Sequence, residues 1–216
     1  GAFIRGARDV NAQIYSNVAR YFARKGLLGI NVGYRLAPEA RYPDGSLDIG
    51  AAVTWVSAHV RDYGGDPERI FLVGHSAGGT HVTTYVADPR ARPAEGHRVH
   101  GIVLLSARLR IEARPDNPNA AGVRAYYGDD SALYEERSPV THAANIDVPV
   151  FIVTAEYDNP YLDVYGVELA HRLGELHKRA PRFTRMTRHN HISLVANFHT
   201  DEEILGLEIL DFIERG

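Results

Sequence analysis

The stretch Gly74-His75-Ser76-Ala77-Gly78-Gly79 decides the fold. It has the pattern G-x-S-x-G, and it lies between the apolar run Ile70-Phe71-Leu72-Val73 and a helical pattern over residues 80–87. A motif of this kind between a strand and a helix predicts a tight turn that holds the serine in a strained backbone conformation. The turn raises the hydroxyl above the carboxyl ends of the strands, where open α/β sheets bind ligands. We expect neighbouring segments to leave no room for a Cβ at Gly74 or Gly78. The alternative interpretation of the motif is a glycine-rich turn that arose by chance.

Strand and helix patterns alternate along the rest of the chain. Apolar runs or apolar alternation predict strands over residues 27–34, 70–73, 99–105, 148–153 and 182–187. Helical periodicity predicts helices over residues 11–25, 46–63, 80–87, 163–178 and 200–214. This alternation indicates an α/β fold in one domain over residues 1–216, with a mainly parallel sheet and helices on both faces. Residues 108–145 are less regular, and both a partial lid and a surface excursion with short helices fit them.

The composition excludes several classes of protein and of site. The 216 residues include no cysteine, so disulfides and thiolate metal sites are excluded. A net charge of -3 gives no reason to expect nucleic acid or an anionic membrane as a partner. No stretch reaches the roughly 18 apolar residues of a membrane helix, and the lack of cysteine is compatible with a cytoplasmic location.

A nucleophilic serine needs a base, and the base needs a carboxylate that orients it. Asp158 follows the predicted strand over residues 148–153, in a loop that Asn159-Pro160 marks, and it is our candidate acid. Glu156 and Asp163 compete with it, and Asp163 also suits a helix cap.

Two histidines follow the next predicted strand, so the base is His189 or His191. Their His-x-His spacing also fits two ligands of a metal ion. No second histidine cluster accompanies them, and the ordered serine, carboxylate and histidine explain the residues without a metal or a cofactor. The remaining histidines, His75 and His81 among them, have surface or packing roles by default.

Several motifs resemble the α/β-hydrolase superfamily, in its hormone-sensitive-lipase-like and carboxylesterase group. They are Tyr34-Arg35-Leu36-Ala37-Pro38-Glu39, Gly64-Gly65-Asp66-Pro67-Glu68-Arg69-Ile70 and Gly74-His75-Ser76-Ala77-Gly78-Gly79. The later part is also similar to the branch of bacterial esterases, feruloyl-esterase-like proteins and arylformamidases. The resemblance implies a catalytic triad of Ser76, Asp158 and His191. It departs at His75, where many hormone-sensitive-lipase-like members carry Asp.

The resemblance also implies an oxyanion hole formed by the N–H groups of Gly1, Ala2 and Ala77. Gly1-Ala2-Phe3 looks like the end of the family's His-Gly-Gly motif, although a terminal Gly-Ala-Phe without meaning is the alternative. The motif's first residues, and the sheet strands before them, would then precede residue 1. We therefore expect several tens of residues upstream of Gly1.

The expected function is serine carboxylesterase activity on short-to-medium acyl esters, through an acyl-enzyme intermediate and without cofactor. An arylformamidase-like amidase with the same triad is the alternative within enzymes, and a non-catalytic binding protein on the same scaffold is the alternative outside them. A peptidase is disfavoured because nothing indicates a second domain. The expected partner is a small-molecule ester, and the resemblance is compatible with a homodimer through an edge strand or the last helix.

Overall fold

Four parallel strands form the sheet of the computed structural model, which describes residues 1–8, 10–11 and 13–215. The strands stand side by side in chain order: β1 (Phe71–His75), β2 (Gly101–Leu105), β3 (Val150–Tyr157) and β4 (Arg182–Asn190). Every residue of β2 is buried, as the unbroken apolar run of a strand covered on both faces requires. Because the strands are parallel, the residues that follow them gather at one edge of the sheet.

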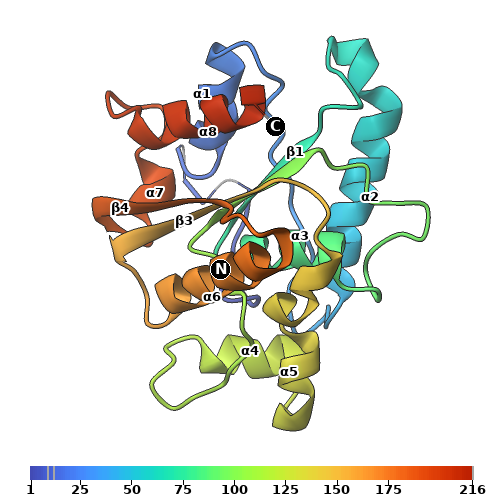
Figure 1. The fold of residues 1–216 in the computed structure, drawn as a ribbon, viewed down its shortest axis with the longest axis vertical. Coiled ribbons are helices and arrows are strands. Elements are labelled where there is room, and N and C mark those ends of the chain that lie inside the picture. The colour runs from blue at the N-terminus through green and yellow to red at the C-terminus, as the bar shows by residue number, and fades with distance from the viewer. Residues whose placement is uncertain (9, 12, 216) are drawn as a thin grey trace.

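Helices cover both faces of this sheet (Figure 1). One face carries α1 (Ser16–Arg24), α7 (Ser193–Ala196) and α8 (Ile204–Arg215). The other carries α2 (Asp44–His59), α3 (Ala77–Ala87) and α6 (Leu162–His177).

Alternate side chains of β2 point to opposite faces and hold the two helical layers. Ile102 and Leu104 belong to the core under α2, α3 and α6, whereas Val103 and Leu105 belong to the core under α1, α7 and α8. Among the described residues, no helix combines the length and the hydrophobicity that crossing a bilayer requires.

The irregular region over residues 108–145 folds into short helices at one end of the molecule (Figure 1). They are α4 (Ala120–Tyr127), η2 (Ser131–Leu133), α5 (Tyr134–Arg137) and η3 (Pro139–Asn145). Tyr126 and Tyr127 of α4 form an aromatic core with Phe3, and Ala77 belongs to the same core. This region therefore lies against both the N-terminal turn and the start of α3.

The strand predicted over residues 27–34 is wrong for the part of the chain that the structure describes. Its alternating apolar side chains are present but exposed: Leu28 at 45%, Ile30 at 47% and Val32 at 37%. A strand exists through backbone pairing with a neighbour, and an alternating pattern does not supply that neighbour.

The other predicted elements are confirmed with shifted ends. The helix predicted over residues 11–25 begins at Ser16, and part of that prediction, Ala12, lies outside the described residues, as does Gly216. The helix predicted over residues 46–63 ends at His59, where the 3₁₀ turn η1 (Val60–Tyr63) follows. The turn η1 ends at Gly64, which has φ +80°. Glycine adopts this left-handed conformation without strain.

Candidate active site

Ser76 occupies the turn between β1 and α3 with φ 55° and ψ −121°. A positive φ at a residue with a side chain is a strained conformation that the surrounding structure must hold. The structure shows where that tightness arises. A Cβ on Gly74 would lie 2.6 Å from Gly79 Cα, and a Cβ on Gly79 would lie 2.4 Å from Ala107 Cβ.

The close approach predicted at Gly78 is wrong. A Cβ added to Gly78 meets no atom of the described residues within 4 Å. The glycine that must lack a side chain on the helical side is Gly79, one residue later.

Asp158 and His191 lie in contact at the carboxyl edge of the sheet. Asp158 directly follows β3, and His191 directly follows β4. The His191 Nδ1 atom is 3.0 Å from Asp158 Oδ1, and the two side chains are 12% and 2% exposed. With Nδ1 engaged, Nε2 is the ring nitrogen left for other chemistry.

The pKa of Asp158 is lowered although its carboxylate is buried. Burial is the largest influence and alone would raise the pKa. Hydrogen bonds from His191, the Ser106 hydroxyl and the Ala155 N–H outweigh it, since each favours the charged form. The carboxylate is therefore held ionised where the His191 ring needs an acceptor.

Ser106 is a contributor to this site that the sequence analysis missed. It follows β2 at φ 44°, is fully buried, and its hydroxyl donates to Asp158 Oδ2. The available signal was its position, a polar residue directly after a buried strand. Asp158 and His191 likewise follow predicted strands, and that position made them candidates.

His75 links the serine turn to the loop that carries His191. Its Nε2 lies 2.9 Å from the His191 carbonyl oxygen, and its Nδ1 lies 3.2 Å from the Tyr15 hydroxyl. A carbonyl oxygen only accepts, so Nε2–H donates to it and Nδ1 accepts from Tyr15. Burial, and secondarily the nearby His191, lower the pKa of His75 to about 3, which keeps the ring neutral. Its role is a specific connection beyond the default packing role.

Through His75 the structure brings the backbone of His191 beside the Ser76 turn. The rings of His75 and His191 have centroids 4.5 Å apart. Among the hydrogen bonds of the described residues, none joins the Ser76 hydroxyl to the His191 ring. The Asp158–His191 hydrogen bond is thus formed, and the described residues show no serine–histidine hydrogen bond.

The three predicted oxyanion-hole residues lie in different settings. Ala77 is the first residue of α3, where an N–H has no acceptor within the helix. Ala2 is buried and has φ 52°. Its carbonyl oxygen lies so close to Gly122 that a Cβ on Gly122 would be 2.0 Å from that oxygen. The Gly1 amino group donates to the Arg5 carbonyl oxygen.

The rival candidates have other partners. Glu156 Oε2 accepts the Arg188 N–H at 2.6 Å, and Asp163 lies in the first turn of α6. His189 Nε2 lies 2.8 Å from Glu202 Oε1. The two histidines thus face different carboxylates, and no group of three or more metal-ligating side chains occurs in the described part of the chain.

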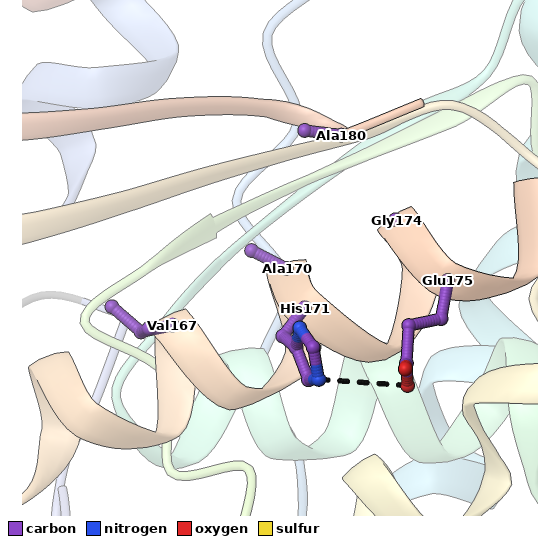
Figure 2. A pocket seen from close by; sticks show the side chains of 6 residues that line it. All are labelled: Val167, Ala170, His171, Gly174, Glu175 and Ala180. Carbon is purple, nitrogen blue, oxygen red and sulfur yellow. Dashed lines mark ion pairs between the residues drawn. The ribbon is translucent and has the colours of Figure 1, made fainter. Parts of the chain in front are cut away.

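A depression of about 430 Å³ lies elsewhere, along α6 and beside Ala180 of the segment before β4 (Figure 2). It is lined by Val167, Ala170, His171, Gly174, Glu175 and Ala180. His171 and Glu175 form an ion pair at 3.5 Å across one helical turn. None of the candidate catalytic residues lines it.

Several known proteins similar to this chain are named as esterases or ester hydrolases. Esterase LipI of Mycobacterium tuberculosis (strain ATCC 25618 / H37Rv) is 46% identical over 174 residues, which cover 73% of this chain and 53% of LipI. The "Probable carboxylic ester hydrolase LipM" of the same organism is 29% identical over 162 residues, covering 64% of this chain and 36% of LipM. The chain therefore spans about a third to a half of the length of these relatives.

Solved structures and family models agree on the fold. The structure of "Bacterial Heroin Esterase" superposes with a TM-score of 0.74 at 26% identity, covering 100% of this chain and 72% of that chain. A family model described as alpha/beta hydrolase fold matches residues 1–192. The predicted fold is confirmed, and the chain belongs to the alpha/beta hydrolase fold family.

Proposed function

We propose that this chain carries the catalytic centre of a serine carboxylesterase, with Ser76 as nucleophile, His191 as base and Asp158 as the orienting acid. The observation that carries the proposal is the buried contact between His191 Nδ1 and Asp158 Oδ1 at 3.0 Å, on a loop tied to the Ser76 turn through His75. The names of the relatives support hydrolysis of esters in particular.

The reaction is acyl transfer to water in two halves. His191 Nε2 takes the proton of Ser76 as its oxygen attacks the ester carbonyl, and the same nitrogen then protonates the leaving alcohol. Water repeats these steps on the acyl-serine and releases the acid. Asp158 holds the Nδ1–H tautomer and stabilises the imidazolium in each half. Catalytic hydrogen bonds are often long or poorly aligned without substrate, so we expect the Ser76 hydroxyl to meet Nε2 in the substrate complex.

The negative oxygen of each tetrahedral intermediate needs fixed donors. The Ala77 N–H, at the N-terminus of α3, is the first of these. Gly1 and Ala2 would supply the others from the N-terminal turn. Loss of one such donor typically lowers the rate by about 10²–10³.

The test compares Ser76→Ala with Ser131→Ala, an exposed serine in η2 that contacts none of these residues. Wild type and Ser131→Ala should hydrolyse p-nitrophenyl acetate and react with a fluorophosphonate probe. Ser76→Ala should do neither while keeping the wild-type circular dichroism spectrum. A labelled, active Ser76→Ala variant would contradict the proposal, and a folded wild type that never labels would favour a non-catalytic binding protein.

Ester and amide hydrolysis are separated by substrate. Short acyl p-nitrophenyl esters should turn over with a higher kcat/KM than N-formylkynurenine. The reverse order would assign the same three residues to an amidase.

A further inference from the structure

Arg108 is a buried cation fixed to the same turn as Ser76. Its side chain belongs to a residue only 3% exposed, two positions after Ser106. Its N–H donates to the Ser76 carbonyl oxygen at 3.3 Å, and its own carbonyl oxygen accepts the Thr80 hydroxyl at 2.7 Å. The backbone of Arg108 is therefore held beside the nucleophile by both sides of the turn.

The guanidinium of Arg108 lacks the partner that buried cations ordinarily have. Nη2 donates to the neutral Asn117 amide oxygen at 3.3 Å, and Cζ lies 5.9 Å from the centre of the Tyr165 ring. Nη1 is buried without a hydrogen-bond partner among the described residues. Within that same set, no carboxylate lies within ion-pair distance of Arg108.

Arg110, two residues later, differs from Arg108 because carboxylates neutralise its charge. Arg110 forms ion pairs with both Glu135 and Glu168. Glu112, whose charge acts on Arg108 from a distance, forms its ion pair with Arg114 at 3.3 Å. The acidic side chains of the region are thus engaged by other arginines.

The surroundings of Arg108 leave its charge uncompensated. Burial lowers its pKa, and the attraction and hydrogen bonding of Tyr165, together with the attraction of Glu112, offset only part of that effect. Arginine stays protonated even so. A charge removed from water needs a counter-charge or a full set of hydrogen bonds, and the described residues give Arg108 neither.

We propose that Arg108 binds a carboxylate carried by the substrate, so that the preferred esters are anionic ones such as monoesters of dicarboxylic acids. This proposal rests on the proposed function, since the bound group is part of the ester that Ser76 attacks. The planar guanidinium matches a carboxylate in two parallel hydrogen bonds. The guanidinium has two neighbouring side chains, Asn117 from the loop before α4 and Tyr165 from α6.

The experiment measures the preference of the wild type within pairs of esters of equal length. Mono-(4-nitrophenyl) adipate against 4-nitrophenyl hexanoate places the carboxylate on the acyl side, and 4-acetoxybenzoate against 4-methylphenyl acetate places it on the alcohol side. In one of the two pairs kcat/KM should favour the anionic ester by about 10- to 100-fold, as a hydrogen-bonded charge pair provides. Arg108→Met should abolish that ratio mainly through KM, and Arg108→Lys should restore part of it.

Arg124→Met is the matched control, because Arg124 is an exposed arginine on α4. It should leave the ratio at its wild-type value. Inhibition of the wild type by adipate, but not by hexanoate, is a second measurement that needs no variant. Equal kcat/KM within both pairs, or a ratio unchanged in Arg108→Met, would overturn the proposal while ester hydrolysis itself stands. Failure of the wild type on all four esters would instead contradict the proposed function.

Discussion

The Ser106 hydroxyl and Oδ2 of Asp158 form a buried hydrogen bond, on the carboxylate oxygen opposite the one that contacts His191. Each oxygen of the carboxylate thus has its own side-chain partner. Each also accepts a hydrogen bond from one backbone N–H, that of Asn159 at Oδ1 and that of Ala155 at Oδ2. A carboxylate held in this way has one orientation. Ser106, Asp158 and His191, the residues directly after β2, β3 and β4, therefore form one chain of hydrogen bonds.

Ser106→Ala should destabilise the protein and weaken catalysis. It removes a hydrogen bond to a buried charge, which is worth about 1.5–3 kcal/mol in the free energy of unfolding. Because that bond helps to lower the pKa of Asp158, the destabilisation should be full at neutral pH and should fade as the pH falls through the folded-state pKa of Asp158. Because this lowered pKa lies below the ordinary value of 3.8, the loss should persist at pH 4 and fade only at lower pH, so urea denaturation at pH 7 and at about pH 2.5 measures it. Equal losses at both pH values would contradict it, and Ser131→Ala is the control.

His75→Phe should lower kcat more than it raises KM. The variant keeps a ring beside His191 but loses the donor to the His191 carbonyl oxygen. We expect a loss of about tenfold in kcat, which corresponds to one hydrogen bond of roughly 1.4 kcal/mol. Tyr15→Phe, which removes only the contact to the far side of the ring, should have a smaller effect. A kcat unchanged in His75→Phe would show that the base loop holds its position without this link.

His81 should make the protein less stable as the pH falls. The ring is 1% exposed among Phe3, Tyr34 and Tyr126. Burial lowers its pKa to about 3, despite an opposing attraction to Asp48. The unfolded chain takes up a proton near pH 6.5 and the folded protein does not, so unfolding becomes easier below that pH.

The effect of His81 reaches about 2 kcal/mol at pH 5. In His81→Phe the loss of stability between pH 7 and pH 5 should shrink by about that amount, as urea denaturation can measure. His171→Gln, a change at an exposed histidine on α6, should leave the loss as in wild type. An identical loss in His81→Phe would contradict the prediction.

Two adjacent glycines should respond to alanine in opposite ways. Gly79→Ala places a Cβ 2.4 Å from the Cβ of Ala107, so we expect a loss of about 1–3 kcal/mol from overpacking against the residue that follows Ser106. Gly78→Ala meets open space on the helix surface and should be neutral or stabilising by up to about 1 kcal/mol. Thermal unfolding of the two variants side by side checks the pair, and equal shifts would contradict the assignment of the close approach to Gly79.

The strand-turn-helix around Ser76 could be predicted from the sequence because its determinants are local. An apolar run, a pair of small residues and a helical pattern follow one another within about twenty positions, and each acts through the backbone of its own segment. That a carboxylate and a histidine follow two later strands was also readable, since parallel strands end at the same edge of a sheet. The choice of His191 over His189 came from the family resemblance. The predicted strand over residues 27–34 failed because pairing requires a partner that the pattern of one segment does not contain.

The sequence by itself determined the alternation of strands and helices, the strained serine turn and the polar residues that follow the strands. Only the tertiary structure decided which of those residues meet: that Ser106 and Ala155 share the carboxylate of Asp158, and that His75 reaches the His191 carbonyl. It also decided that Arg108 is buried with no counter-charge among the described residues. The physical reason is the distance along the chain over which each kind of interaction acts. Backbone propensity and apolar periodicity act over a few neighbouring residues, whereas hydrogen bonds and burial depend on which distant segments the packed core brings into contact.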